Sequence, residues 1–351
     1  MKTVTIGGKK IGKGHPVFVI AEAGVNHNGS LPRALEHIRK AKKAGADAIK
    51  FQTYKAEKLV TKKAKKYWNV GDDDLSQFET FSKFDEFPAG HYKKMIQYGK
   101  KIGITVFSTP FDLDAVDLLE DAGVPAYKIS SSDMTFFPML RKIAKTKKPI
   151  ILSTGASSVA EIRESVKYIR SFGNDKIILL QCVLAYPTRQ SDAHLLMIDA
   201  LQKAFPGMHI GLSDHTFSPL TPALAVMRGA CVVEKHYTVD KSLPDSPDHK
   251  LGVDPAEMRV LVDAVRLAEE SLGQMKKEVL QSEMPARKLA RKSVTSRVMI
   301  QKGARIEPSM LIGKRPGTGI PTKYMESLTG RRAKKNIPED TTMTWGMVSS
   351  A

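Results

Sequence analysis

The sequence has few cysteines and no apolar run long enough to cross a membrane. Its 351 residues include two cysteines, Cys182 and Cys231, each in a short apolar run. We therefore expect two free thiols in a reducing compartment rather than a disulfide. Apolar runs such as 17–21 and 177–180 are far shorter than the roughly 18 to 20 residues of a transmembrane helix. Because no apolar signal segment follows Lys2, we expect a cytoplasmic protein with no membrane partner.

The sequence also has too few acidic residues to balance its basic ones, and its formal net charge is +18. Residues 1–70 contain 16 Lys and Arg against 4 Asp and Glu, and residues 273–351 contain 16 against 6. No basic motif with interleaved aromatic residues and no helix-turn-helix pattern accompanies this charge, so we expect no nucleic-acid partner. Solvated lysine-rich helix faces are the simplest explanation, and a basic site would attract a small anionic substrate.

Eight short apolar runs alternate with segments of helical periodicity. The runs are 17–21, 48–52, 105–107, 126–129, 149–152, 177–182, 210–212 and 232–233. Continuous apolar runs are typical of parallel strands that are covered on both faces. An eight-fold alternation over about 260 residues predicts an α/β protein with a TIM (β/α)8 barrel. A doubly wound open sheet is the alternative, but no GxGxxG fingerprint opens the first helix.

Several segments lie outside the eight-fold pattern. The glycine-rich residues 2–14 predict an N-terminal hairpin. We predict a barrel domain at 1–272, a linker at 273–290 and a small separate domain at 291–351, which at this size is marginally stable alone. The excursion from 53 to 88, rich in Lys, Asp and aromatic residues, is long enough to predict a lid or a substrate-specificity element.

Two histidines end neighbouring strands of the predicted barrel. The stretch 210–236 reads as strand, helix, strand, and its strands end at His215 and His236. Because parallel strands end on the same side of a barrel, we expect both imidazoles on one face, where they suit a divalent metal such as Mn, Zn or Fe.

Other polar residues also fall at the predicted strand ends, where TIM barrels carry their active sites. They are Glu22, Lys50, Gln52, Ser108, Thr109, Lys128, Ser153, Thr154, Gln181, Ser213 and Glu234. Two lysines, Lys50 and Lys128, beside several hydroxyls predict a site for phosphate and carboxylate together. A Schiff-base aldolase that uses one of the lysines is a competing interpretation. Glu22 and Asp133 are carboxylates suited to proton transfer or to holding sugar hydroxyls.

Motifs along nearly the whole chain resemble those of the N-acetylneuraminate (sialic acid) synthase family. They are AEAGVNHNG at 21–29, KFQT at 50–53, FSTPF at 107–111, YKI at 127–129, LSTG at 152–155, GLSDH at 211–215, EKH at 234–236 and RPGTG at 315–319. The C-terminal unit is similar to the antifreeze-like (SAF) domain that ends these synthases.

The resemblance implies a transferase that condenses phosphoenolpyruvate with an N-acetylated hexose, with N-acetylmannosamine favoured. C3 of phosphoenolpyruvate attacks the sugar aldehyde, water adds at C2, and phosphate leaves by C–O cleavage. The product is an N-acetylneuraminate-type 2-keto acid. The family frame also implies a divalent metal, typically Mn²⁺ with Mg²⁺ or Co²⁺ possible, held by His215 and His236.

The resemblance also assigns roles to individual residues, with Glu22 as the proton-transfer residue. The residues that would bind phosphoenolpyruvate are Lys50, Thr109, Lys128, Ser131, Ser153 and Ser213. Those that would surround the sugar are Glu22, Gln52, Asp133, Tyr186 and Asp248. Arg315 would reach from the terminal domain into the partner subunit and contact the N-acetyl group, which implies a domain-exchanged homodimer.

Three departures from the family pattern leave the acceptor open. Leu184 stands where a polar residue is common, Asp133 where glutamate is common, and 130–132 is serine-rich instead of glycine-rich. Legionaminate and pseudaminate synthases share the same frame, so a 2,4-diacetamido sugar is the alternative acceptor, and a 6-phosphate on the sugar is also open. A non-catalytic binding protein on the same scaffold is a further alternative.

Overall fold

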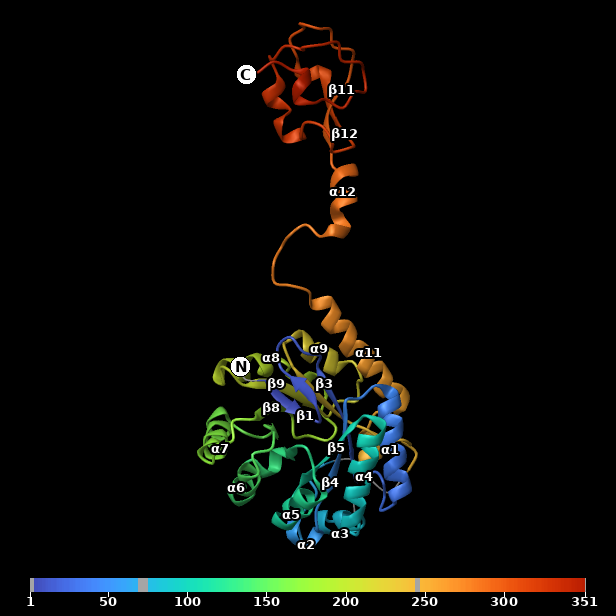
Figure 1. The fold of residues 1–351 in the computed structure, drawn as a ribbon, viewed down its shortest axis with the longest axis vertical. Helices are drawn as coiled ribbons and strands as arrows, with labels where there is room; N and C mark the ends of the chain where they lie inside the picture. The colour runs from blue at the N-terminus through green and yellow to red at the C-terminus, as the bar shows by residue number, and fades with distance from the viewer. Residues whose placement is uncertain (1–2, 69–74, 244–246, 351) are drawn as a thin grey trace. The chain divides into compact units, whose positions relative to one another are not determined.

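The computed structural model describes residues 3–68, 75–243 and 247–350. These residues divide into two compact units, Met1–Gly273 and Gln274–Ala351. In the first unit, eight parallel strands form a closed barrel in the order β10-β3-β4-β5-β6-β7-β8-β9. The barrel confirms the predicted fold class, and its outer helices surround the strands (Figure 1).

Every predicted apolar run forms a barrel strand. The strands are β3 (Phe18–Gly24), β4 (Ala48–Thr53), β5 (Thr105–Pro110), β6 (Tyr127–Ile129), β7 (Ile150–Ser153), β8 (Ile177–Cys182), β9 (His209–Asp214) and β10 (Val232–His236). Nearly all of their side chains are buried, as the continuous apolar runs predicted. Several strands extend past the apolar runs into polar residues, which places those polar residues at the carboxyl ends.

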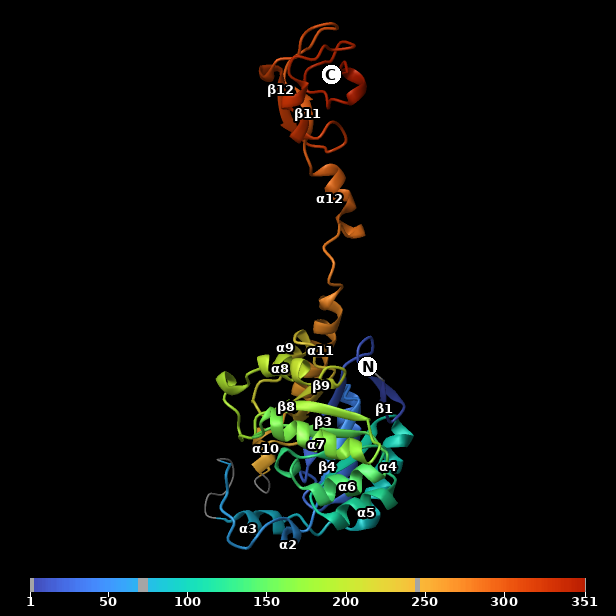
Figure 2. The same ribbon diagram turned by 90° about the vertical axis from the view of Figure 1, so that its left-hand side faces the viewer.

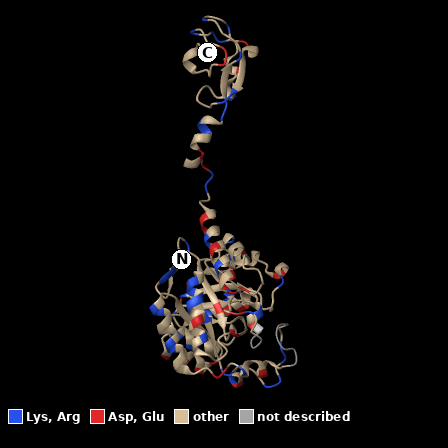
Figure 3. Cartoon of the chain, turned by 90° about the vertical axis from the view of Figure 1, so that its right-hand side faces the viewer, with Lys and Arg blue, Asp and Glu red and all other residues tan. Residues whose placement is uncertain are grey.

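The helices of the first unit are largely those that the apolar periodicity predicted. They are α1 (Leu31–Ala44), α2 (Ala56–Leu59), α3 (Gln77–Ser82), α4 (Ala89–Ile102), α5 (Leu113–Ala122), α6 (Phe137–Lys145), α7 (Val159–Ser171), α8 (Leu196–Ala204), α9 (Thr221–Met227), α10 (Pro247–Leu251) and α11 (Pro255–Leu272). Local sequence sets their limits: the Ser30 side chain caps α1, and Gly45 ends it in a left-handed conformation with φ of 96°. Lys and Arg residues are spread over several outer helices (Figure 3).

The predicted N-terminal hairpin is present as β1 (Val4–Ile6) and β2 (Lys9–Ile11), which pair antiparallel. It packs against strand starts: a Cβ at Gly7 would lie 2.0 Å from Thr105 Oγ1, and one at Gly12 would lie 2.4 Å from His209 Cε1. Because these residues begin β5 and β9, the hairpin covers the amino-terminal end of the barrel. The carboxyl-terminal end is therefore free of it.

The excursion between β4 and β5 contains two short helices, α2 and α3, for which no helix was predicted from the sequence. Ser76 and Glu79 form a capping box that starts α3. Tyr54 and Phe84, from the two ends of the excursion, pack together with Val25 in a small apolar cluster. Figure 2 shows α2 and α3 at the opposite end of the barrel from β1.

The second unit has its own apolar core, which includes Val294, Ile306, Ile320, Ile337 and Met343. Its regular elements are α12 (Met284–Leu289), β11 (Ser293–Ser296) and β12 (Leu311–Lys314), and the two strands pair antiparallel. The short helix α12 falls inside the segment predicted as a linker, where good helix formers follow Pro285.

Candidate active site

The carboxyl ends of the barrel strands meet around a small cavity of about 60 Å³, which we call the inner cavity. Most of the predicted site residues line it: Glu22, Lys50, Gln52, Thr109, Lys128, Ser131, Ser153, Tyr186, Ser213, His215 and His236. Side chains with a predicted role in phosphate and carboxylate binding therefore lie together, at the end of the barrel where TIM-barrel enzymes carry their chemistry.

Lys50 is buried in the inner cavity beside a carboxylate. Its ammonium group forms an ion pair with Glu22 and donates a hydrogen bond to Thr109 Oγ1 over 2.9 Å. Gln52 Nε2 donates to the other oxygen of Glu22 over 3.1 Å. The pairs Glu22–Lys50 and Gln52–Thr109 are also direct neighbours across β3, β4 and β5, so strand register brings these side chains together.

A second lysine and carboxylate, Lys128 on β6 and Glu234 on β10, also line the inner cavity. Lys128 Nζ lies 3.4 Å from Glu234 Oε1, and Ser213 Oγ donates to the same oxygen over 2.9 Å. The Ser153 hydroxyl is buried and has no hydrogen-bond partner among the described residues. The inner cavity thus contains two ammonium groups, two carboxylates and a hydroxyl that is free to bind a ligand.

The ionisation of Glu22 depends on two opposing effects. Burial raises its pKa to about 7, although the ammonium of Lys50 favours the carboxylate. A carboxyl group with a pKa near neutrality exchanges protons readily under physiological conditions, as a general acid or base must. When Glu22 is protonated, the positive charge of Lys50 is no longer neutralised by it.

The two predicted metal-binding histidines lie side by side, with 5.2 Å between their ring centroids. The ring of Tyr186 packs against both, at 4.2 Å from His215 and 5.8 Å from His236. His215 Nδ1 lies 2.7 Å from the carbonyl oxygen of Val183, so this nitrogen carries the proton and donates it. Its Nε2 is then the nitrogen with a free lone pair, which is the arrangement that orients metal-binding histidines.

The pKa values of the histidines differ. Burial lowers the pKa of His236 well below its usual value, and the neighbouring His215 and Lys50 lower it further. Burial also lowers the pKa of His215, but the negative charge of the Cys182 sulfur when it is ionised, together with hydrogen bonds to Cys182 and the Val183 carbonyl, outweighs this effect and raises the pKa overall. The neutral imidazole of His236 has no hydrogen-bond partner at Nδ1 among the described residues. It is therefore able to coordinate an ion.

These two histidines fit a divalent metal that is only partly coordinated by the protein. The described residues contain no group of three or more His, Cys, Asp or Glu side chains placed to hold a metal ion. Two imidazoles would hold an ion such as Mn²⁺ and would leave other coordination positions open to substrate and water. An open coordination sphere is the property that separates catalytic from structural metal sites.

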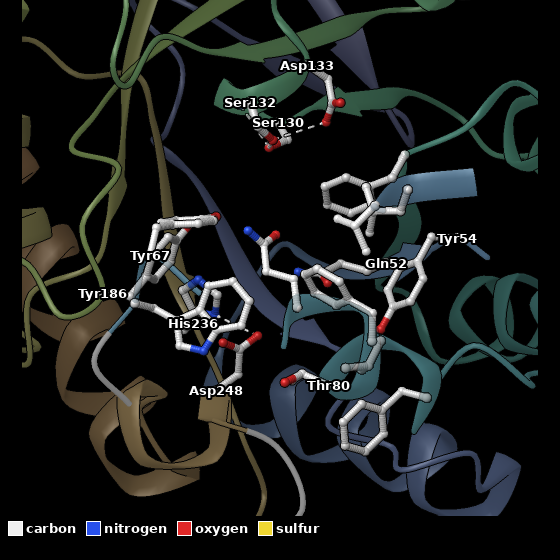
Figure 4. A pocket seen from close by; sticks show the side chains of 18 of the residues that line it. Gln52, Tyr54, Tyr67, Thr80, Ser130, Ser132, Asp133, Tyr186, His236 and Asp248 are labelled. Carbon is white, nitrogen blue, oxygen red and sulfur yellow. Dashed lines mark hydrogen bonds and ion pairs between the residues drawn. The ribbon is translucent and has the colours of Figure 1, made fainter. Parts of the chain in front are cut away.

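A larger cavity of about 330 Å³, which we call the outer cavity, is also lined by Gln52, Tyr186 and His236. It contains the two remaining predicted sugar-contact residues of the barrel, Asp133 and Asp248. Asp133 belongs to a 3₁₀ turn, Ser131–Asp133, that follows β6. Asp248 lies in α10, where its Oδ2 is 3.6 Å from His236 Nδ1. Figure 4 shows these two carboxylates on opposite sides of the cavity.

The structure adds site residues that sequence reasoning did not assign. Cys182 is free and buried, and its sulfur lies 4.0 Å from His215 Nδ1; Cys231 is free and half-buried. Glu234 was recognised as a strand-end residue without a role, and only its contact with Lys128 gives it one. The aromatic residues of the excursion line the outer cavity. Leu184 lies against Gly155 and does not line either cavity.

Arg315, the remaining predicted contact residue, is exposed in the second unit, directly after β12. The Ser293 hydroxyl donates to the carbonyl of Pro316 over 2.7 Å and accepts from the amide of Gly319, so the RPGTG segment is tied to β11. Its predicted role in a partner subunit stays a prediction.

Within the part of the chain that the structure describes, every helix is too short or too polar to span a membrane.

Comparisons with known proteins agree with this architecture. The NeuB family model matches residues 37–277, and the SAF domain model matches residues 291–349. The chain is 40% identical to the N,N'-diacetyllegionaminic acid synthase of Legionella pneumophila, over 96% of each chain. It is 34% identical to the N-acetylneuraminate-9-phosphate synthase of Mus musculus, over 98% of this chain and 96% of that one.

A solved structure gives the same result. The N-acetylneuraminic acid (sialic acid) synthetase of Leptospira borgpetersenii matches with a TM-score of 0.73 and 34% identity, over 81% of this chain and 94% of that chain. The barrel that carries the strand-end site is thus matched by a family model and by relatives that cover most of the chain. The chain belongs to the NeuB family, and its C-terminal unit contains a SAF domain.

Proposed function

We propose that this enzyme condenses phosphoenolpyruvate with the aldehyde of an N-acetylated hexose. C3 of phosphoenolpyruvate forms a bond to C1 of the sugar, a water oxygen adds at C2, and the C2–O bond to phosphate breaks. The products are a nonulosonic acid, which is a nine-carbon 2-keto acid, and inorganic phosphate. The observation that carries the proposal is the pairing of an inner cavity that contains two lysines and several hydroxyls with a larger outer cavity that is lined by Asp133 and Asp248.

The inner cavity suits phosphoenolpyruvate. Lys50 and Lys128 would balance the phosphate and carboxylate charges, and Thr109, Ser131, Ser153 and Ser213 would donate hydrogen bonds. With Glu22 and Glu234 both ionised, the two ion pairs neutralise this cluster. Protonation of Glu22 leaves a net positive charge, which favours an anionic ligand.

Glu22 is our assignment for proton transfer. The reaction needs a proton on the aldehyde oxygen as it becomes a hydroxyl, and water must lose one as it adds to C2. The pKa of Glu22, raised to about 7, and its place between Lys50 and Gln52 support this assignment. His215 and His236 would hold Mn²⁺, or Mg²⁺ or Co²⁺, and the bound ion would polarise the aldehyde and orient water.

The outer cavity suits the sugar. Gln52, Asp133, Tyr186 and Asp248 offer hydrogen bonds to its hydroxyl and amide groups, and N-acetylmannosamine is the simplest acceptor. A 2,4-diacetamido hexose, which would give a legionaminate- or pseudaminate-type product, is the second candidate. We also propose a domain-exchanged homodimer in which Arg315 of one subunit contacts the N-acetyl group bound in the other.

Two other functions have weaker support. A Schiff-base aldolase would use Lys50 or Lys128 as its nucleophile, whereas the amino group of each is engaged in an ion pair with a buried carboxylate. A non-catalytic binding protein has no need for a carboxyl group whose pKa is tuned to neutrality in a cavity next to two histidines.

The test is phosphate release from phosphoenolpyruvate by metal-stripped protein, with and without added Mn²⁺. The acceptors are N-acetylmannosamine, its 6-phosphate and 2,4-diacetamido hexoses, with arabinose 5-phosphate and erythrose 4-phosphate as controls. We expect release only with metal and an N-acetylated sugar. Release that is independent of the acceptor, or that survives both His215→Ala and His236→Ala, would contradict the proposal.

A further inference from the structure

A groove between the outer helices α1 and α11 has a volume of about 800 Å³, and we call it the α1–α11 groove. Its lining residues come from 39–44 of α1, from the segment 239–242 after β10, and from 254–259 at the start of α11. Within the described chain, no residue that lines this groove also lines the inner or the outer cavity. Small-molecule sites usually have volumes of about 300 to 1,000 Å³, so the groove is large enough for a separate ligand.

The α1–α11 groove is rich in positive charge. The basic side chains that line it are Arg39, Lys40, Lys43, Lys241 and Arg259. Arg39 and Lys43 are exposed and lie one turn apart on the same side of α1. Neither side chain has an ion pair or a hydrogen bond with another described residue. Like charges at this spacing repel each other, so an anion bound between them would stabilise both.

The other three cations of the groove are weakly engaged. Each has an acidic partner at the protein surface, in the pairs Lys40–Glu36, Lys241–Glu257 and Arg259–Asp263. All of these side chains are about a third exposed or more, and ion pairs in such positions contribute little to stability. A bound anion can therefore compete for these cations at little cost.

The two carboxylates that line the groove, Asp240 and Asp254, are already bound by the backbone. Asp240 accepts from the amide and the hydroxyl of Ser242 over 2.9 and 2.6 Å. Asp254 caps α11 and accepts from the amides of Ala256 and Glu257 over 2.8 and 2.9 Å. Because these first-turn amides are occupied, the end of α11 is not an open anion site. A ligand must be bound by the basic side chains.

A buried hydroxyl without a partner lies near the groove. Tyr237 is 0% exposed, and its hydroxyl has no hydrogen-bond partner among the described residues. Burial raises the pKa of Tyr237, the charges of Asp254 and Glu36 raise it further, and that of Arg39 lowers it. Since Asp254 and Arg39 line the groove, the hydroxyl lies within electrostatic range of it. Buried hydroxyls are nearly always paired, so this one indicates a place for a polar atom that the protein does not supply.

We infer that the α1–α11 groove binds a polyphosphate ligand of the nucleotide class, with its phosphates between Arg39 and Lys43. Adjacent phosphate groups carry several negative charges, which match cations from three segments of the chain better than a single carboxylate would. The groove also has an apolar part, formed by Ala44, Val239, Pro255 and Ala256, which can cover a base or a ribose. This second site does not depend on the proposed function.

The test measures binding of ATP and UTP to the full-length protein by calorimetry, in buffer without divalent ions. The inner cavity, at about 60 Å³, is too small for either nucleotide. Inorganic triphosphate and adenosine separate the contributions of the phosphates and the nucleoside. We expect at least one nucleotide to bind, inorganic triphosphate to bind about threefold more weakly or less, and adenosine alone to give no measurable binding. Absence of binding by both nucleotides at millimolar concentration would overturn the inference, and equal affinity for inorganic triphosphate would overturn the nucleotide class.

Two double variants with the same change in net charge test the location of the site. Arg39→Gln with Lys43→Gln removes the two unpaired cations of the groove and should weaken nucleotide binding about tenfold or more. Lys93→Gln with Lys94→Gln is the matched control, because these exposed lysines of α4 do not line the groove. The control should bind nucleotide within about twofold of wild type. Equal losses in the two double variants would show general attraction to a basic surface and overturn the inference.

A negative charge added to the groove supplies an independent check. Ala256 is exposed in the first turn of α11, where a carboxylate is favourable for the helix, so Ala256→Glu should fold normally. Ala256→Glu should weaken nucleotide binding about fivefold or more through repulsion of the phosphates, whereas Ala256→Gln, of nearly the same size, should weaken it less than about twofold. Equal affinities of the Glu and Gln variants would overturn the placement of the phosphates in this groove.

Discussion

Phosphoenolpyruvate binding should weaken as the pH rises above neutrality, because Glu22 and the ligand compete for Lys50. Burial raises the pKa of Glu22 to about 7, and its carboxylate contacts the Lys50 ammonium. Below pH 7 the carboxyl group is protonated, and the charge of Lys50 is available to the anion. Above pH 7 the ionised carboxylate neutralises that charge and repels the ligand.

The size of the effect follows from linkage. If the anion binds only the form with protonated Glu22, its dissociation constant rises by up to about tenfold per pH unit above 7, or about 1.4 kcal/mol per unit. Glu22→Gln keeps the shape of the side chain and an oxygen for Gln52, but it is neutral at every pH. The variant should therefore bind phosphoenolpyruvate with a flat dependence above pH 7, while its kcat falls by roughly a hundredfold or more because proton transfer is lost.

Calorimetric titration of phosphoenolpyruvate between pH 6 and 9, without an acceptor, measures this difference. Ionisation of the ligand affects the dissociation constants of wild type and Glu22→Gln equally, so its effect cancels in the ratio of the two constants. Asp133→Asn is the matched control: the pKa of Asp133 is also raised to about 7, but its carboxyl lies in the outer cavity. Parallel pH profiles for wild type and Glu22→Gln would refute the competition.

Three further predictions concern other parts of the chain. Asp214 and Lys235 form a buried ion pair at 2.7 Å. Asp214→Ala or Lys235→Met alone should lower the free energy of unfolding, measured with urea, by about 3 to 5 kcal/mol. The double variant should lower it by less than the sum of the two single effects, and additive effects would contradict the coupling. His37 donates from Nδ1 to the Arg33 carbonyl and accepts at Nε2 from Val239, and burial lowers its pKa from 6.5 to about 4. Neutral His37 should therefore stabilise the fold by about 3 kcal/mol above pH 6.5, and this contribution should be lost as the pH falls to about 4. His37→Gln should flatten the plot of unfolding free energy against pH over that range. The same slope in the variant and the wild type would contradict this role of His37. Arg315→Ala should raise KM for the sugar more than KM for phosphoenolpyruvate in steady-state assays, and equal effects would contradict its assigned contact.

The sequence predicted the barrel because burial on both faces makes its strands continuous apolar runs. It also predicted that Glu22, Lys50 and Lys128 would lie close together, since parallel strands of a barrel all end on one side. Residues on loops could not be placed in this way. Tyr186 and Asp248 were assigned roles only through family resemblance, and Asp133 was singled out only as a carboxylate. The structure brings all three to the outer cavity.

The aromatic side chains that line the outer cavity show why the rest of the site could not be predicted from the sequence. Tyr54, Trp68 and Phe81 are separated along the chain by segments without a strong period, so no local pattern indicates that their rings meet. Their contact depends on how α2 and α3 pack, which is a tertiary property. The role of Glu234 likewise depends on its distance from Lys128, which belongs to a strand on another side of the barrel.

Formation of the carbon–carbon bond between phosphoenolpyruvate and the sugar distinguishes the proposed condensation from simple hydrolysis of phosphoenolpyruvate. Phosphoenolpyruvate labelled with carbon-13 at C3 is incubated with the holoenzyme, Mn²⁺ and an unphosphorylated 2,4-diacetamido hexose, or N-acetylmannosamine, and is followed by NMR together with phosphate release. We expect one phosphate per product and a labelled methylene bonded to the former aldehyde carbon. Labelled pyruvate, with its methyl group intact and phosphate released, would instead identify a phosphoenolpyruvate hydrolase and contradict the proposed condensation.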